Sequence, residues 1–402
     1  MQTPAHLRLL DSPRIRLMIL ILCAAQIIFT TLEFAFPIEI RGAVKMKDYD
    51  AFHVAGRMFW EGILIEAYQT DTLFEAQRRI TGTESFMPWT YPPQFNLVTA
   101  VLALMPVWLG YALFTVVTFV AYVLALRRLA GPRYIIVMLA LFPAMVICIR
   151  TGQNGFLIGA LLGLFAILML DRRTVAGLPL ALLTIKPHYL PGIGLYLLFT
   201  GQWRIIALGA GATAVIMGAA TLAFGADIWP AFLAAIPEAG YFLELGAYPL
   251  FRMTSVYAAM HTLGLPPAMA MAAQLSVGLA GLGVLVWAWR RGWPPRQLLG
   301  VAVMGSLFFS PYAYDYDLPI LGVALALLMP DLIARGTARQ IAVMLMGCWA
   351  TTFASLGMAL SDTGTATVLS QRMQEMPPSL GAWVLIPVCL LVIRIIRQPE
   401  QA

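Results

Sequence analysis

Charged residues are scarce in this sequence. Only 11% of its 402 residues are Asp, Glu, Lys or Arg, whereas 60% are hydrophobic, and the mean hydropathy is +0.80. Soluble domains carry roughly one quarter charged residues. The composition therefore excludes an ordinary soluble protein and predicts an integral membrane protein built from apolar helices.

Cysteine and the common catalytic signatures are also scarce. The four cysteines lie inside apolar runs and lack the spacing of a disulfide framework or a zinc site. The sequence contains no phosphate-binding glycine loop, HExxH motif, nucleophile elbow or dinucleotide fingerprint. A nucleotide-dependent cytoplasmic reaction thus has no visible site, and we expect no bound cofactor.

Apolar runs bounded by arginines or polar turns predict an all-α polytopic bundle, one integral membrane domain over residues 1–402, with about 12 transmembrane helices. Residues 174–200 are short for two spans, so a kinked pair around Pro187 is an alternative. The expected spans are 15–36, 108–126, 134–150, 155–171, 174–186, 188–200, 205–224, 267–289, 297–311, 317–334, 339–359 and 381–397.

The distribution of charge predicts the orientation. With both termini inside, the inner face receives 16 of the 26 basic residues but only four of the 20 acids, as expected for a bacterial-type inner or plasma membrane. The net charge is then +12 inside and −6 outside. The basic residues reflect topology rather than nucleic-acid binding. Three outer loops remain, at 37–107, 225–266 and 360–380.

The first outer loop opens with KMKDYDAFHVAGRMFW, residues 45–60, whose spacing predicts an amphipathic juxtamembrane helix. His53 and Arg57 fall one turn apart on its polar side, and Asp48 is placed as its N-cap. We interpret the charged face as directed toward a cavity. The alternative is that Asp48 and Asp50 are solvated loop acids. Later in the same loop, YPPQFN places Tyr91 at the entry to a short interfacial helix over 94–106.

A second acid triplet, Asp315, Tyr316 and Asp317, lies in SPYAYDYDLPIL at the outer mouth of the predicted bundle. Carboxylates at such a position cost several kcal/mol unless they are paired, so they are candidates for a functional site. A helix-start cap would account for one of the two acids. It would leave the other unexplained.

Three further stretches carry polar groups on the outer side. IRTGQNGF supplies the amides of Gln153 and Asn154, which suit sugar hydroxyls or a phosphate, although the same residues are ordinary in a loop. TIKPHYLP places Lys186 and His188 at a helix break, where the lysine either snorkels or pairs with an anion. Arg252 lies among aromatic residues in the 225–266 loop.

The order of these motifs, DYDAFHVAGR, then YPP, GQN, IKP and SPYAYDYD, resembles family-87 glycosyltransferases of the GT-C superfamily. The best-known members of that family are polyprenol-phosphate-mannose-dependent mannosyltransferases. The resemblance implies a membrane enzyme with its site on the outer, periplasmic face. It would take a hexose, mannose in the best-known members, from a polyprenyl phosphate and transfer it with inversion to a lipid or glycan acceptor.

The resemblance also implies a catalytic acid in the first outer loop, which by motif register falls on Asp48 rather than Asp50. Many relatives resemble Asp-His-His where this chain has Asp315, Tyr316 and Asp317, so the resemblance does not supply a histidine at that position, and His53 or His188 is the alternative source of one.

A cation must stabilise the phosphate that leaves, and the candidates are Arg57, Lys186 and Arg252. Because the leaving group is a single phosphate, a divalent metal is not required, although four outer carboxylates offer oxygen ligands for one.

Two functions from other classes compete with this interpretation. A transporter of polyprenyl-linked or lipid-linked sugars would use the outer acids as a gate, but it predicts essential ionisable residues near the membrane midplane. A scaffold subunit needs no converging acids at all. The acid-rich outer mouth favours the enzyme.

Overall fold

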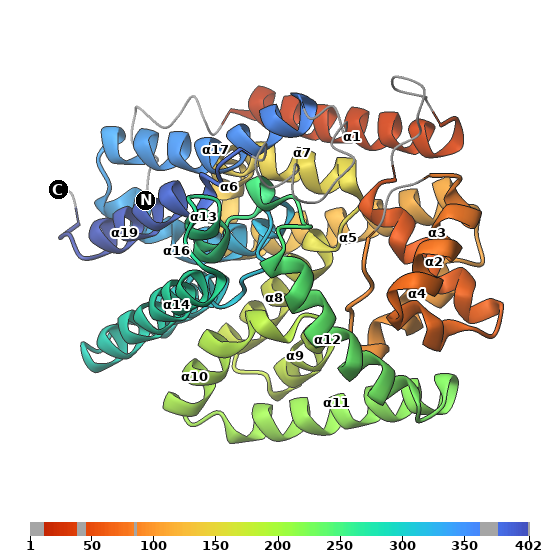
Figure 1. Ribbon diagram of the computed structural model, residues 1–402. Coiled ribbons are helices and arrows are strands. Elements are labelled where there is room, and N and C mark those ends of the chain that lie inside the picture. The colour runs from red at the N-terminus through yellow and green to blue at the C-terminus, as the bar shows by residue number, and fades with distance from the viewer. Residues whose placement is uncertain (1–11, 38–45, 84–86, 362–376, 401–402) are drawn as a thin grey trace.

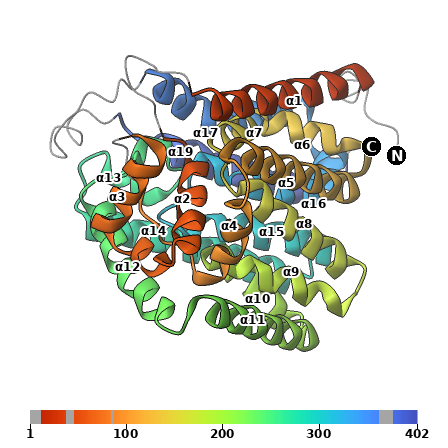
Figure 2. The same cartoon turned by 90° about the vertical axis from the view of Figure 1, so that its right-hand side faces the viewer.

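The computed structural model describes residues 12–37, 46–83, 87–361 and 377–400, and its elements in these ranges are helices (Figure 1). Most of the predicted outer loop 360–380 lies outside the described residues. Helices α1 and α11 lie on opposite sides of the molecule in both views (Figure 2). The segments that carry the predicted motifs lie between them.

Five helical segments within the described residues are long and apolar enough to cross a membrane. They contain α1 (Pro13–Ala35), α5 (Val107–Ala130), α11 (Trp203–Phe224), α14 (Pro267–Arg290) and α16 (Pro319–Arg335). In α16, 83% of the apolar window is buried, against 17% to 22% in α1, α11 and α14. Helix α16 is therefore the central helix, and the other three present apolar faces outward.

Shorter or less apolar helices occupy the other expected spans, so the number of crossings stays a prediction. The break expected at Pro187 is present, because short 3-10 turns over residues 183–185 and 187–189 interrupt the chain between α9 and α10. The bounds are α6 Tyr134–Ala140, α7 Phe142–Thr151, α8 Gly155–Leu170, α9 Gly177–Leu182, α10 Pro191–Phe199, α15 Pro295–Ser306, α17 Ala338–Ser361 and α19 Gly381–Ile396.

The first outer segment folds into helices that lie against the bundle. It contains α2 (Asp48–Trp60), α3 (Thr70–Thr81) and α4 (Asn96–Leu102). The amphipathic helix predicted over 45–60 is present as α2. The helix predicted over 94–106 is shorter than expected, because Pro106 already starts α5. Gly56 on α2 lies directly against the backbone of α4, where a Cβ atom would overlap the Thr99 carbonyl oxygen.

The segment 225–266 also contains helices, α12 (Ile228–Glu244) and α13 (Val256–His261). Helix α12 crosses the first outer segment and packs against residues 64–68. Between α12 and α13, a 3-10 turn over Leu250–Arg252 brings Arg252 back toward the bundle.

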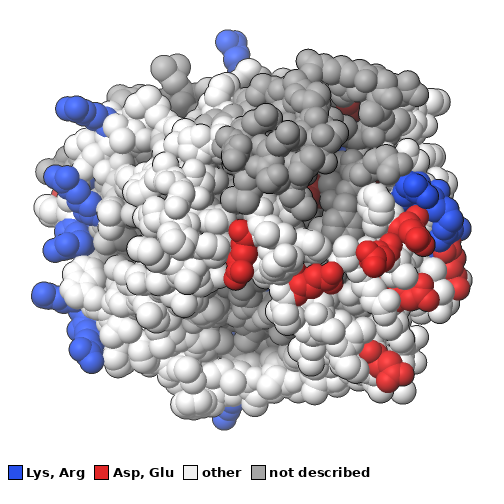
Figure 3. Space-filling view, in the orientation of Figure 1, with Lys and Arg blue, Asp and Glu red and all other residues white. Residues whose placement is uncertain are grey.

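Charge is segregated between the two ends of the helices. In Figure 3 the basic side chains lie mostly along the left edge and the acidic ones gather on the right. Arg296 donates to the carbonyls of Leu129 and Leu327, and Arg335 donates to that of Ile396, so the ends of α5, α16 and α19 meet at the basic edge. This segregation is the pattern that the charge distribution of the sequence predicts.

Candidate active site

Asp48 begins α2 but does not cap it, so the prediction of Asp48 as the N-cap was wrong. The N-cap is Lys47, whose backbone N–H donates to the Asp50 side chain at 2.7 Å. Asp50 therefore supplies the capping carboxylate, from the third position of the helix. The Asp48 side chain is left free to face the bundle, and 17% of it is exposed.

Arg252 joins the two acid motifs. Its Nε and Nη2 donate to the two carboxylate oxygens of Asp315 at 3.3 and 3.0 Å, in the two-point geometry that only a guanidinium provides. Its Nη1 lies 4.0 Å from Asp48 Oδ2. The two carboxylates, from opposite ends of the sequence, thus face the same cation.

Asp315 is fully engaged, whereas Asp48 is not. Besides Arg252, Asp315 accepts from the Ser355 hydroxyl at 2.9 Å and from the Tyr316 backbone N–H at 2.8 Å, and its side chain is 1% exposed. Asp48 has one hydrogen bond at the distance limit and one ion contact. Asp315 is therefore a fixed counter-ion, and Asp48 is the carboxylate that can accept a proton.

Lys186 and Asp317 form a second, more deeply buried ion pair. Their Nζ and Oδ1 atoms are 2.7 Å apart, and the side chains are 8% and 2% exposed. The other oxygen of Asp317 accepts from the Tyr314 backbone N–H at 3.1 Å. The anion that Lys186 binds in this structure is thus a carboxylate of the protein itself.

Tyrosine rings fill the space between the two cations. Tyr314 and Tyr316 are stacked, with centroids 4.9 Å apart. The Arg252 guanidinium lies 5.6 Å from the Tyr316 centroid, and Lys186 Nζ lies 5.4 Å from it. Both distances are within the range of cation–π attraction. Tyr316 therefore contacts both cations.

Gln153 connects Asp48 to Tyr91. Helix α7 ends at Gly152, which adopts the left-handed conformation with φ 67°, and the turn directs Gln153 toward α2. Tyr91 Oη donates to Gln153 Oε1 at 3.0 Å, and Gln153 Nε2 donates to Asp48 Oδ1 at 3.5 Å. The neighbouring Asn154 is fully buried, and its side-chain amide has no hydrogen-bond partner among the described residues.

The start of α8 lies against the acid triplet. At Gly155 the absence of a side chain lets the Tyr316 carbonyl oxygen contact the helix, where a Cβ atom would overlap it. This contact fixes the backbone of the triplet against α8.

Three other predicted site residues lie outside these ion pairs. Arg57 is exposed and follows Asp48 by nine residues, about 14 Å along α2. His53 is partly buried on the same helix, and His188 packs its ring against Tyr189. Arg57 is thus not brought together with Asp48 and Asp315, whereas Arg252 is, and Lys186 pairs with Asp317 of the same acid triplet.

Burial and neighbouring charges set the ionisation of the acids on α2. Burial raises the pKa of Asp48, while the Arg252 guanidinium and the Gln153 hydrogen bond oppose that rise. Burial likewise raises the pKa of Asp50 to about 6. Burial and Arg57 lower the pKa of His53 to about 4, so this imidazole is neutral at pH 7.

The acids are arranged around a side-chain cation. Within the described residues, no group of three His, Cys, Asp or Glu side chains converges as a metal site would require. Arg252 stands between Asp48 and Asp315, in the position where a divalent ion would have to bridge them. The donor set therefore fits a guanidinium.

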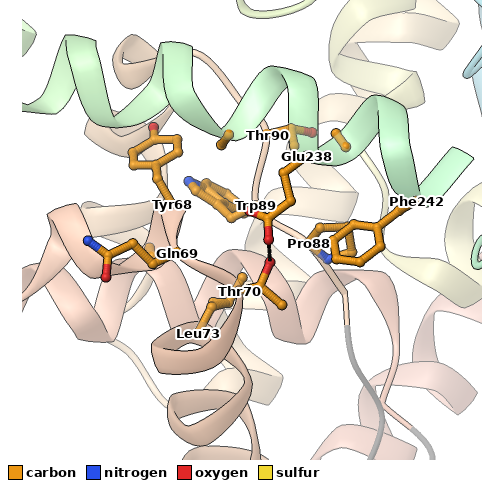
Figure 4. Close-up of a pocket in the computed structure, with 12 residues that line it drawn as sticks. Tyr68, Gln69, Thr70, Leu73, Pro88, Trp89, Thr90, Glu238 and Phe242 are labelled. Atoms are coloured by element: carbon orange, nitrogen blue, oxygen red, sulfur yellow. Dashed lines mark hydrogen bonds between the residues drawn. The ribbon is translucent and has the colours of Figure 1, made fainter.

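A small pocket lies beside this cluster, between α12 and the first outer segment (Figure 4). Trp89 and Phe242 line it, and the Thr70 hydroxyl donates to Glu238 at 2.5 Å across it. Tyr68, another lining residue, donates to the Tyr91 carbonyl at 2.9 Å. Through this hydrogen bond, the wall of the pocket contacts Tyr91, which donates to Gln153.

Sequence reasoning missed two groups of the cluster. Ser355 lies in an apolar stretch of α17, where a single serine gives no signal of a role. Tyr314 contributes a backbone N–H and a stacked ring, and only its place beside the acid triplet pointed to it.

Residues 89–311, more than half of the chain, match the sequence profile of glycosyltransferase family 87. The matched region contains Tyr91, Gln153, Lys186 and Arg252 and ends before the acid triplet. No curated protein and no solved structure gives a significant match. The profile confirms the resemblance drawn from the order of the motifs, and the chain belongs to glycosyltransferase family 87.

Proposed function

We propose that this membrane glycosyltransferase moves a hexose, mannose by analogy with the best-known relatives, from a polyprenyl phosphate to a lipid or glycan acceptor with inversion. The observation that carries the proposal is the pairing of a partly exposed, under-coordinated carboxylate, Asp48, with the free nitrogen of a guanidinium anchored on Asp315.

Asp48 acts as the general base. The acceptor hydroxyl attacks the anomeric carbon, its proton passes to Asp48, and the bond from that carbon to the phosphate oxygen breaks. Such assistance typically contributes 10²–10⁴-fold to the rate. Attack from the side opposite the leaving oxygen inverts the configuration.

Arg252 stabilises the polyprenyl phosphate as it leaves. Two of its nitrogens are fixed on Asp315, so Nη1 is the group that can bind a phosphate oxygen. As Asp48 becomes neutral, the phosphate gains the charge that Asp48 loses. The net charge beside Arg252 is therefore constant through the reaction.

Donor binding has to widen the gap between Asp48 and Arg252. Inversion places the base and the leaving oxygen on opposite faces of the sugar, so the sugar ring must lie between them. The 4.0 Å contact between the two side chains is an ion contact without a hydrogen bond, and it opens more easily than the two-point pair with Asp315.

The orientation follows from the charge distribution. Cytoplasmic ends of membrane helices are enriched in Lys and Arg, and the basic residues gather at the edge opposite most of the acids (Figure 3). The cluster around Arg252 then faces the periplasm or outside, and both termini are cytoplasmic. A polyprenyl-linked donor reaches that face within the membrane.

The test uses the purified full chain in lipid nanodiscs with radiolabelled polyprenyl-phosphate mannose and a mixed glycolipid extract. We expect transfer of label to a glycolipid, a loss of at least 10²-fold in Asp48→Asn, and normal transfer in the control Asp71→Asn, whose exposed side chain lies on α3. Undiminished transfer in Asp48→Asn would refute the assignment of the base.

The same preparation separates the alternatives. A transporter would move the labelled lipid between leaflets without forming a new glycoside. A requirement for divalent metal would appear as loss of transfer with a chelator, and we expect the rate to survive chelation.

A further inference from the structure

The Gln153 side chain has its amide orientation fixed by two donors. Its Oε1 accepts from Tyr91 Oη at 3.0 Å and from the Asn154 backbone N–H at 3.1 Å. The Asn154 N–H can only donate, so the oxygen must face it, the Tyr91 hydroxyl beside it donates to the same oxygen, and the NH₂ group faces the other way. The other way is Asp48, whose Oδ1 lies 3.5 Å from Nε2.

Tyr91 is itself held in place. Its carbonyl accepts from the Tyr68 hydroxyl at 2.9 Å, and that hydroxyl accepts from Asn96 at 2.9 Å. The Tyr91 ring packs edge-on against Phe52 of α2, with centroids 5.6 Å apart. The phenol that orients Gln153 therefore has little freedom to turn away.

We propose that Gln153, oriented by Tyr91, is a positioning residue that holds the Asp48 carboxylate toward the acceptor hydroxyl. This inference rests on the proposed function. Asp48 has two polar partners, Arg252 and Gln153. When the leaving phosphate occupies Arg252, the Gln153 amide is the partner that keeps the carboxylate from following the guanidinium. Hydrogen bonds of catalytic groups often tighten only in the reactive complex, so a long contact is compatible with this role.

Other ionisable groups also face Asp48 and have to be considered in any pH profile. Arg252 and Lys186 favour its ionised form, and Asp315 opposes it. Asp50 interacts with it along α2. The Gln153 hydrogen bond is the uncharged contribution that favours the carboxylate.

A double-mutant cycle on the kcat of sugar transfer tests the proposal. We expect Gln153→Leu to lower kcat by about 10²-fold, the loss typical of a small misplacement of a reacting group, with little change in the KM for the donor. Tyr91→Phe should lower kcat less. The double variant should be no slower than Gln153→Leu, because Tyr91 acts through Gln153.

Two further variants distinguish the loss of the Gln153–Asp48 contact from a general loss of folding. Gln153→Glu keeps the size and the accepting oxygen, but it replaces the NH₂ donor to Asp48 with a carboxylate oxygen and adds negative charge beside the base, so we expect a loss of kcat at least as large. Gln297 donates to Asp331 at 2.5 Å at the basic end of the bundle. Gln297→Leu thus removes a similar Gln–Asp bond and should leave kcat unchanged.

The pH profile provides a readout that a merely structural role would not move. Loss of the donor to Asp48 raises the pKa of that carboxyl, so the acidic limb of kcat/KM should move to higher pH in Gln153→Leu and stay in place in Gln297→Leu.

The outcomes separate the two proposals. Full transfer in Asp48→Asn refutes the base and the positioning role together. If Asp48→Asn is inactive but the losses in Tyr91→Phe and Gln153→Leu multiply, each residue contacts substrate independently, and the positioning role alone is refuted. A wild-type rate in Gln153→Glu refutes it as well.

Discussion

Replacing Arg252 by glutamine should shift the pH dependence of transfer as well as its rate. The guanidinium lies 4.0 Å from Asp48. Two unit charges at that distance interact by about 4 kcal/mol at an effective dielectric constant of about 20, and this attraction favours the ionised form of Asp48. Without this cation, Asp48 keeps the burial that raises its pKa and loses the main influence that lowers it.

The expected result is a base that is protonated over a wider range of pH in Arg252→Gln than in the wild type. The acidic limb of kcat/KM should move to higher pH, so activity recovers in part as the pH rises. The loss of the phosphate contact, on the order of 10²–10³-fold, does not recover. Arg252→Lys keeps the charge but loses the two-point contact with Asp315, and it should have a small pH shift and a reduced rate.

The assay is initial-rate transfer from pH 5 to 10 in nanodiscs, with thermal unfolding of each variant to verify folding. Arg78→Gln on α3, where the arginine is exposed, is the control. A folded Arg252→Gln whose profile has the wild-type shape at a uniformly lower rate would refute the claim that this guanidinium keeps Asp48 ionised.

Three further predictions concern stability, measured by thermal unfolding in detergent. Lys186→Met should lower the free energy of unfolding by about 3–5 kcal/mol, because it leaves a buried carboxylate unpaired, and adding Asp317→Leu should restore most of the loss. Asp50 and His53 titrate with opposite effects. The raised pKa of Asp50 makes stability fall as the pH rises from about 4 to 6, and the lowered pKa of His53 makes it rise over about 4 to 6.5. Compared with the wild type, the melting temperature of Asp50→Asn should therefore rise more steeply with pH in this window, and that of His53→Gln should fall more steeply; curves parallel to that of the wild type would contradict the assignment. Gly155→Ala should destabilise by about 1–3 kcal/mol, because its Cβ atom overlaps a backbone oxygen, and an unchanged melting temperature would contradict that packing.

The helical class and the approach of the two distant acid motifs could be predicted from the sequence, because both depend on the lengths of apolar runs and on the distribution of charge along the chain. Apolar run length indicates membrane helices, and the alternation of basic and acidic ends indicates which loops share a side. That reasoning placed Asp48 and Asp315 on one side, and the structure has both facing Arg252.

The sequence could not predict which residues of the site form hydrogen bonds or ion pairs with one another. Asp48 and Asp50 are equivalent as helix-start acids, and only the coordinates distinguish them. Asp50 accepts from the Lys47 N–H and Asp48 does not. Lys186 had no identifiable anion, because Asp317 is more than one hundred residues away in the chain. The contact of Ser355 with Asp315 could be recognised only from the structure, which places α17 beside the acid triplet.

The contact between Gly155 and Tyr316 packs the acid triplet closely against α8 and so fixes one wall of the site. A displacement of Asp315 or Asp317 would also displace the start of α8. A donor that binds on this side therefore has to fit the existing shape of the wall. The opposite wall carries the Asp48 side chain, which has fewer partners and can adjust to the molecule that binds there. Substrate analogues that differ on the acceptor side should consequently be tolerated better than analogues altered near the phosphate.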